Sequence, residues 1–228
     1  MPRRLPLPLR LAGLGGWGDD PLWASVYDWS VEHPQPGSVM WRAGLGSDLS
    51  LLYAAASEIG RQPAGSAVLD VPVGGGVALR GLRPGQGVRY VAADISRTML
   101  ERTLAAARRR QVAVQVEPVL ADVGALPFED GEFDLVVSFT GLHCFPDPHR
   151  AVREMGRVLH PGGVLTASAI LNDTGLRYEG VRRTGRLAGL LGPGATRPQL
   201  RAWLEEADLT EVSLRRSGAI VYFRGVRV

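Results

Sequence analysis

Residues 67–76 read AVLDVPVGGG, and this stretch decides the fold. A short apolar run ends at an aspartate, Asp70, and three consecutive glycines follow shortly after it. A continuous apolar run bounded by glycines is typical of a strand buried on both faces of a parallel sheet. Glycines directly after such a strand let the backbone approach a ligand closely. We therefore predict a buried strand over 67–71 whose carboxyl end borders a binding site.

Strands and helices alternate on the C-terminal side of this stretch. Such alternation indicates an α/β fold with a doubly wound, mostly parallel sheet that is Rossmann-like and covered by helices on both faces. The last part of the chain predicts a hairpin around Ser217-Gly218, which brings the predicted total to a seven-stranded sheet. The predicted strands are 67–71, 88–94, 118–122, 133–139, 164–170, 210–216 and 219–225, and the predicted helices begin at Gly76 or span 97–110, 149–159 and 200–207.

The first 62 residues differ in composition from the rest of the chain. They hold four of the five tryptophans, Trp17, Trp23, Trp29 and Trp41, and one predicted helix over 48–59. We expect residues 1–62 to form a helical lid over the substrate and residues 63–228 to form the core. The glycine- and arginine-rich stretch 172–198 is predicted to be an insertion on the substrate side of that core.

Composition excludes several classes of protein. The 228 residues are 45% hydrophobic and 21% charged, which is ordinary for a globular domain and unlike a disordered chain or a coiled coil. The single cysteine, Cys144, excludes an internal disulfide framework and a cysteine-based zinc site, and we expect no metal. No stretch approaches the roughly 18 apolar residues of a membrane span. We interpret residues 1–16 as a tail rather than a signal peptide, and expect a cytoplasmic protein.

All 26 basic residues are arginine, and the net charge is +3. The densest basic run, Arg108 to Arg110, ends a predicted helix, where cations complement the helix dipole. A phosphate-binding patch is the alternative interpretation of this run. No other basic cluster suggests nucleic acid as a partner, and the sequence does not indicate an oligomeric state.

Three aspartates lie where predicted parallel strands end. Asp70, Asp94 and Asp122 would meet at one edge of the sheet, which is where open α/β sheets bind ligands. A dinucleotide and S-adenosylmethionine both suit such a site. The dinucleotide fingerprint requires the glycine spacing G-x-G-x-x-G, which fails here because its last position, counted from Gly74, is Leu79.

At this point the sequence resembles the class I S-adenosylmethionine-dependent methyltransferases, in their small-molecule "type 11" branch. The resemblance is carried, in order, by VLDVPVGGG (68–76), AADISRTML (92–100), ADVGALPFEDGEFDLVVSF (121–139) and GLHCFPDPHRAVREMGRVLHPGG (141–163). SGAIVYFRG (217–225) also resembles the ubiquinone/menaquinone-biosynthesis methyltransferases, more weakly. The family has glycine more often than proline at the position of Pro72, and proline lacks an N–H donor.

The resemblance implies roles for particular residues. The amino-acid end of S-adenosylmethionine would contact Asp70 and the loop from Pro72 to Gly76. Asp94 would accept hydrogen bonds from the ribose hydroxyls, Asp122 would accept one from the adenine amino group, and Phe139 would lie near the sulfonium. The full set of cofactor-binding residues that it implies is Asp70, Val71, Pro72, Gly74, Gly76, Asp94, Ile95, Met99, Asp122, Val123 and Phe139.

Methyl transfer from a sulfonium requires alignment of the reactants above all. His143, just past the predicted strand 133–139, is the candidate general base if the acceptor must lose a proton; a structural role is the alternative. Tyr27, His33 and Tyr178 are candidate substrate contacts. The tryptophan-rich lid favours an apolar or ring-containing small molecule as the acceptor.

Three other functions remain open from the sequence. An RNA or protein methyltransferase would need a recognition module, and we find none; Phe139-Thr140-Gly141-Leu142 also differs from the motif of nucleic-acid amino-group methyltransferases. A non-catalytic binding protein could keep the same fold. A nicotinamide-dependent oxidoreductase is disfavoured by the glycine spacing.

Overall fold

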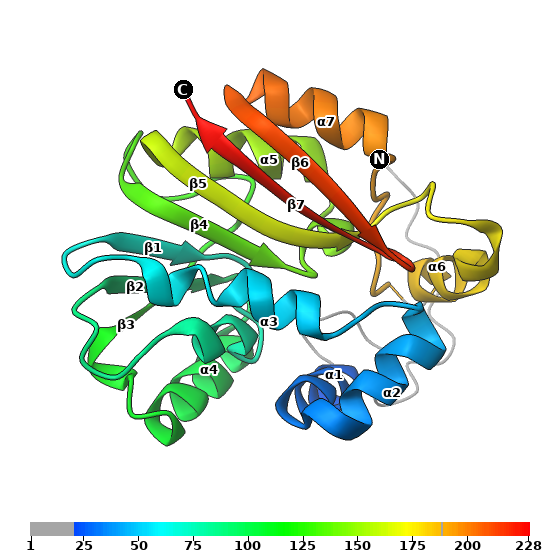
Figure 1. Ribbon diagram of the computed structural model, residues 1–228, viewed down its shortest axis with the longest axis horizontal. Helices are drawn as coiled ribbons and strands as arrows, with labels where there is room; N and C mark the ends of the chain where they lie inside the picture. Colours follow the sequence, from blue (N-terminus) through cyan, green and yellow to red (C-terminus); the bar gives the residue numbers. More distant parts are fainter. Residues whose placement is uncertain (1–20, 188) are drawn as a thin grey trace, which may run out of the picture.

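The computed structural model describes residues 21–187 and 189–228, in which seven strands form one sheet flanked by helices (Figure 1). The strand order is β3-β2-β1-β4-β5-β7-β6, and β7 runs in the opposite direction to the other six strands. This arrangement confirms the predicted doubly wound, mostly parallel sheet. The strands are β1 (Ala67–Asp70), β2 (Arg89–Asp94), β3 (Val116–Leu120), β4 (Phe133–Phe139), β5 (Leu159–Ile170), β6 (Leu209–Ser217) and β7 (Ile220–Arg227).

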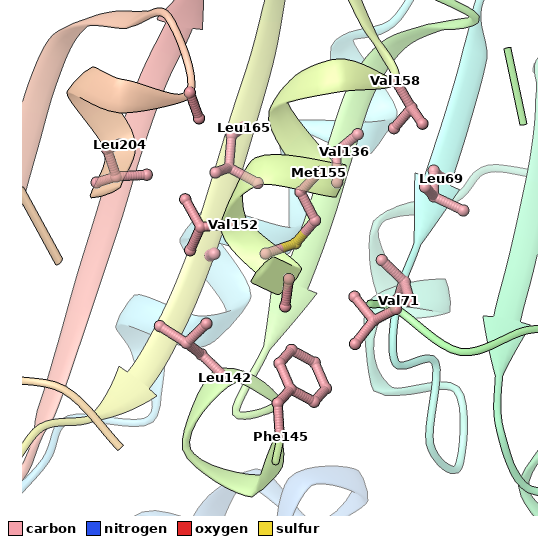
Figure 2. Close-up of a cluster of buried hydrophobic side chains, with 14 of the residues drawn as sticks. Leu69, Val71, Val136, Leu142, Phe145, Val152, Met155, Val158, Leu165 and Leu204 are labelled. Atoms are coloured by element: carbon pink, nitrogen blue, oxygen red, sulfur yellow. The ribbon is translucent and has the colours of Figure 1, made fainter. Parts of the chain in front are cut away.

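Each face of the sheet is buried by its own layer of helices. Successive side chains on a strand point to opposite faces, so Val68 and Leu69 of β1 enter different cores. Leu69 packs with α5 (Pro148–Arg157) and α7 (Arg197–Glu206), where Met155 and Leu204 are fully buried (Figure 2). The opposite face is covered by α3 (Ser50–Ala56) and α4 (Arg97–Arg109). Burial on both faces explains why the strands are apolar without alternation.

Two N-terminal helices, α1 (Pro21–Glu32) and α2 (Pro34–Leu45), precede this core. Val31 and Trp41 are buried in the same cluster as α3 and α4, so these helices are anchored to the core. The expected helical character of the N-terminal segment is therefore confirmed. Residues 1–20, with Trp17, lie outside the described residues, as does the side chain of Trp23.

The helix predicted to begin at Gly76 is only a short 3-10 helix, η2 (Val77–Gly81). Gly81 lies so close to the backbone of Ala56 that a Cβ atom there would overlap its carbonyl oxygen, and Pro84 follows shortly after. The close packing requires glycine at this position, and the proline prevents the helix from continuing. Strand β3 also begins and ends two residues earlier than predicted, which leaves Asp122 in the loop that follows it.

Short elements complete the described chain: η1 (Ile59–Arg61), η3 (Ala113–Gln115), η4 (Leu142–Cys144), η5 (Leu176–Tyr178) and α6 (Glu179–Leu187). Ser96 caps α4 as predicted, its hydroxyl accepting a hydrogen bond from the Met99 N–H at 3.4 Å. In the part of the chain that the structure describes, no helix has both the length and the apolar character required to cross a membrane.

Candidate functional site

A cavity of about 310 Å³ opens at the carboxyl ends of β1, β2 and β4. This edge of the sheet is where the strand order reverses between β1 and β4, the usual ligand position in such folds. Its walls combine three aspartates, the glycine loop after β1 and a group of apolar side chains. The lining residues are Tyr27, Asp70, Pro72, Val73, Gly74, Gly75, Val77, Ala78, Asp94, Ile95, Met99, Asp122, Val123, Phe139, Thr140, Gly141, Cys144, Phe145, Pro146 and Gly189.

Asp70, the last residue of β1, is almost fully buried at the base of this cavity. Its Oδ2 accepts a hydrogen bond of 2.5 Å from the hydroxyl of Tyr90, which is itself inaccessible to solvent. Burial raises the pKa of Asp70 to about 8, although the Tyr90 hydrogen bond opposes the shift. The negative charge of nearby Asp94 adds to the rise in pKa. A cationic group bound beside Asp70 would lower this raised pKa again, because its positive charge would stabilise the ionised carboxylate.

Asp94 ends β2 and holds the glycine loop in place. Its Oδ2 accepts the Gly74 N–H at 3.0 Å, and its Oδ1 accepts the Ser96 N–H at 2.9 Å. Burial raises the pKa of Asp94, while these backbone hydrogen bonds counteract the rise. Gly74 has a φ of +53°, a left-handed conformation that favours glycine, and its carbonyl accepts a bond of 2.7 Å from Thr103. The loop is thus fixed in a shape that lines the cavity with backbone.

Asp122 and Val123 form another wall, in the loop after β3. The side chain of Asp122 is exposed, and its Oδ1 accepts the Gly124 N–H at 2.8 Å. Ile95, directly after β2, and Met99, in the first turn of α4, also line the cavity. These residues give the cavity an apolar slot with one carboxylate at its edge.

The end of β4 provides Phe139 and a residue that sequence reasoning missed, Thr140. Thr140 has a φ of +54°, which is costly for a β-branched residue and occurs most often at functional positions. Its hydroxyl lies 2.6 Å from that of Tyr27 on α1. This contact joins the N-terminal helices to the sheet edge across the cavity. The position directly after a buried strand was the available signal for Thr140.

The position of Gly141 also requires a glycine, because the ring of Pro72 lies very close to its backbone. A Cβ atom there would overlap the ring of Pro72, so the β1 and β4 loops pack directly against each other. Pro72 therefore contributes to the cavity wall as a rigid apolar surface. Cys144, Phe145 and Pro146 continue this wall, and neither they nor Gly189 were among the sequence-predicted site residues.

The cavity brings together nine of the residues that the resemblance implied for the cofactor, but not Val71 or Gly76. Val71 points into the hydrophobic core, and its N–H donates to the Val137 carbonyl oxygen at 3.0 Å. Gly76 caps η2 and packs against Leu79 and Thr103. Both residues support the loop rather than line the cavity.

His143 does not line the cavity. It is buried in η4, and its Nδ1 accepts the Ile170 N–H at 3.1 Å. Burial lowers the pKa of His143 to about 4, so the ring is neutral at physiological pH. These features fit the structural alternative for His143 better than a base.

Of the three candidate substrate contacts, the structure places only Tyr27 at the cavity. His33 is exposed and stacks on Trp29, with 4.8 Å between ring centroids. Tyr178 is buried, and its hydroxyl packs against Gly46 at the end of α2. Tyr178 therefore joins the segment around η5 to the N-terminal helices.

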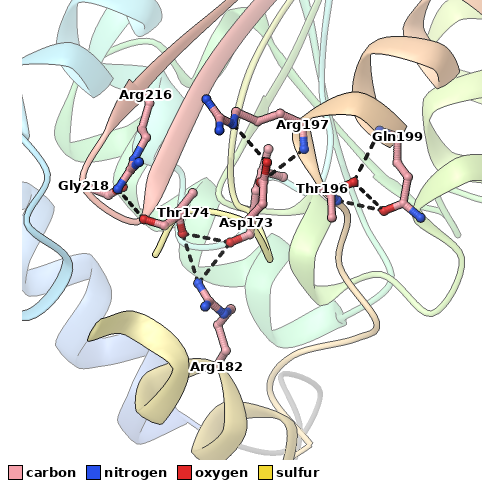
Figure 3. A network of polar contacts seen from close by, with 9 residues as sticks. Asp173, Thr174, Arg182, Thr196, Arg197, Gln199, Arg216 and Gly218 are labelled. Atoms are coloured by element: carbon pink, nitrogen blue, oxygen red, sulfur yellow. Dashed lines mark hydrogen bonds and ion pairs between the residues drawn. The ribbon is translucent and has the colours of Figure 1, made fainter. Parts of the chain in front are cut away.

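The segment that carries η5 and α6 is fixed by an arginine network (Figure 3). Arg182 is buried, and its guanidinium donates to the Leu171 carbonyl oxygen, the Thr174 hydroxyl and the Gly175 carbonyl oxygen at 3.0–3.2 Å. Arg216 donates to the carbonyl oxygen of Thr174. These bonds satisfy buried backbone acceptors that the turn after β5 leaves without a strand partner. The network holds α6 beside the cavity, whose lining includes Gly189.

Comparison with known proteins agrees with this fold. The model of the methyltransferase domain family matches residues 69–167. A demethylmenaquinone methyltransferase of Clavibacter sepedonicus is 41% identical over 101 residues, 44% of this chain and 39% of that protein. A ubiquinone/menaquinone biosynthesis C-methyltransferase of Enterobacter sp. is 40% identical over 103 residues, 44% of this chain and 41% of that protein. Residues 69–167 are thus similar to a methyltransferase domain.

A solved structure with the same fold is that of a possible exported protein from Bordetella parapertussis. It superposes with a TM-score of 0.72 at 21% identity, over 90% of this chain and 79% of that chain. The curated relatives are matched over only 24–41% of their own length. The family model covers β2, β3, β4, the second half of β1, most of β5 and most of the cavity lining, whereas the N-terminal helices, α6, β6 and β7 lie outside it.

Proposed function

We propose that the protein binds S-adenosylmethionine in this cavity and transfers its methyl group to a small, apolar or ring-containing acceptor. One observation carries the proposal. Three carboxylates, Asp70, Asp94 and Asp122, come from the ends of three neighbouring strands and line a single cavity beside a glycine loop. A domain of the methyltransferase family contains all three.

The residues present fit the amino-acid end of S-adenosylmethionine. Asp70 is a buried carboxyl with a raised pKa, and the ammonium group of the cofactor would favour its ionised form. Gly74 and Gly75 present backbone to the same part of the cavity, and a Cβ atom at Gly74 would project into open space. Backbone without side chains is suited to a carboxylate that must approach closely.

The remaining carboxylates suit the adenosine end. Asp94 is oriented by two backbone N–H groups, and its oxygens retain lone pairs for ribose hydroxyls. Asp122 is exposed at the edge of the slot formed by Ile95, Met99 and Val123, where it would accept the adenine amino group. These assignments extend the family resemblance onto residues that line one cavity.

The bound cofactor would supply a sulfonium, whose positive charge activates the leaving group for in-line displacement. The protein's contribution is then to position the acceptor, and good alignment can provide roughly 7–11 kcal/mol. Phe139, Thr140 and Tyr27 would form the part of the wall nearest the reacting methyl group and exclude water from it. We do not assign a proton-accepting role to His143.

The proposed class of acceptor is supported by the apolar side chains in the rest of the cavity wall. Val77, Phe145 and Pro146 are apolar, so a neutral acceptor with an apolar surface fits best. The two relatives described above are named for quinone biosynthesis, which supports a ring-containing acceptor. Residues 1–62 would act as the lid and residues 172–198 as the substrate-side insertion, since Tyr27 and Gly189 both border the cavity. The cytoplasmic location stays a prediction.

A panel of acceptors tests this proposal. Purified protein with methyl-labelled S-adenosylmethionine should label apolar phenols or quinols and release S-adenosylhomocysteine in equal amount. We expect Asp94→Asn to lose this transfer, whereas Asp130→Asn, which changes an exposed aspartate that does not line the cavity, should retain it. Labelling of RNA or protein in place of any small acceptor would contradict the proposed substrate class.

A further inference from the structure

Exposed large apolar side chains are concentrated on two segments of the molecule, the N-terminal helices α1–α2 and the η5–α6 segment. Among the described residues, eleven large hydrophobic side chains are strongly exposed, and seven of them lie on α1, α2 and the η5–α6 segment. Single exposed apolar residues are common, but a concentration of them marks an interaction surface. These seven, which we call the apolar rim, are Val26, Trp29, Val39, Met40, Leu176, Val181 and Leu187.

The apolar face is clearest on α2. Pro36, Val39, Met40 and Ala43 are all exposed and recur at helical spacing on its outward side. The opposite side of the helix buries Trp41 in the core. Helix α2 therefore has apolar residues on both sides, and only one of these sides has a partner within the described chain.

Both rim segments border the candidate active site. Tyr27, between Val26 and Trp29, lines the cavity, and so does Gly189, two residues after Leu187. The contact of Tyr178 with Gly46 joins the η5–α6 segment to the end of α2. The rim thus lies on the segments that contribute Tyr27 and Gly189 to the cavity lining, together with α2, which contacts both of these segments.

The charge on the η5–α6 segment is positive. Arg177, Arg183 and Arg186 form no ion pair with a carboxylate within the described residues. The acidic residue of this segment, Glu179, pairs with buried Arg182 at 2.9 Å. On α1, Glu32 is likewise neutralised, by Arg110 at 2.7 Å. Exposed leucines interspersed with arginines that no carboxylate neutralises complement an anionic, apolar surface.

We propose that the apolar rim contacts the surface of a lipid bilayer that contains anionic lipids. Tryptophan and aliphatic side chains would enter the headgroup boundary while the arginines contact lipid phosphates. Contact at this face would present the cavity to molecules dissolved in the bilayer. This consequence rests on the proposed function, because it concerns delivery of an apolar acceptor. The membrane contact itself does not depend on the proposed function.

Vesicle flotation with the full-length protein tests the proposal. We expect flotation with vesicles of phosphatidylcholine and phosphatidylglycerol, and much less with phosphatidylcholine alone. Arg183→Gln should weaken partitioning about fivefold, the effect of one arginine near an anionic surface. Val39→Ser combined with Met40→Ser should weaken it at least as much, because two apolar side chains lose their membrane contact.

The matched control is Val114→Ser, which changes a side chain that is 94% exposed in η3 and lies outside the rim. It should float as the wild type does, and all variants should keep the wild-type melting temperature. Absence of flotation, or flotation unaffected by the rim substitutions, would overturn the proposal. So would a dimer, seen by light scattering, that the Val39/Met40 substitutions dissociate, because the rim would then bind a second copy. Titration of the same samples with S-adenosylmethionine tests cofactor binding independently, so failure of the membrane contact and failure of the proposed function can be distinguished.

Discussion

Burial in the folded protein raises the pKa of Asp70 far above its ordinary value. Its pKa is about 8 in the folded protein and about 3.9 in an unfolded chain. Between these pH values the folded state holds a proton that the unfolded state lacks, so this group's contribution to stability falls as pH rises. Buried His143, with a pKa of about 4 against about 6.5 when unfolded, acts in the opposite direction, but only up to about pH 6.5.

We therefore expect the unfolding free energy to fall between pH 6.5 and pH 8 in the absence of ligand. Asp70→Asn keeps a partner for Tyr90 but cannot titrate, so it should remove most of this fall. Urea unfolding at several pH values measures the slope, with Asp130→Asn as the control. An unchanged slope in Asp70→Asn would show that Asp70 is already ionised.

His143 allows a second prediction at this scale. His143→Leu removes the acceptor of the Ile170 N–H and leaves that group buried without a partner. We expect the unfolding free energy to fall by about 1–3 kcal/mol, while affinity for S-adenosylhomocysteine stays close to that of the wild type. His160→Leu, at an exposed position, is the control. Loss of methyl transfer with unchanged stability would instead support a base.

Residue roles were predictable from the sequence where a strand end fixes them. Asp70 and Asp94 follow apolar runs, so their convergence on one cavity follows from the parallel sheet. His143 and Tyr178 were not predictable in this way, because each lies in a short 3-10 helix whose orientation depends on tertiary packing. Thr140 also follows a buried strand, but its left-handed backbone and its contact with Tyr27 could not be predicted from the sequence.

At the scale of elements, the insertion with α6 depends on one buried arginine. Arg182 donates to three acceptors in the turn after β5. We expect Arg182→Met to leave those acceptors unsatisfied and to speed amide hydrogen exchange over residues 171–187 by about tenfold or more. The central strands should exchange as in the wild type.

Arg183→Met on the same helix, which changes an exposed arginine, should have little effect on exchange. If Arg182→Met left the exchange of residues 171–187 unchanged, the network in Figure 3 would not be what holds α6. The sequence predicted this stretch only as an irregular insertion. The apolar periodicity of this stretch is weak, and the helix is held by the hydrogen bonds of Arg182 to the turn that precedes it.

For the whole molecule, the mostly parallel sheet could be predicted from the alternation of apolar runs with helices, whereas the spatial order of the strands was not predicted. Strand β4 agrees with its predicted bounds, because an apolar run buried on both faces has unambiguous ends. The N-terminal helices could be predicted as a covering segment from their tryptophans. Their link to the sheet through Tyr27 and Thr140 could not, since these residues are 113 positions apart.

Calorimetric titration with S-adenosylmethionine and S-adenosylhomocysteine tests the central claim most directly. Wild type and Asp130→Asn should bind both ligands with micromolar affinity, and Asp94→Asn should bind neither measurably, because Asp94 holds the glycine loop and would accept the ribose hydroxyls. A folded wild-type protein that binds neither ligand, or an Asp94→Asn variant that binds them as tightly as the wild type, would contradict the claim that this cavity is the cofactor site.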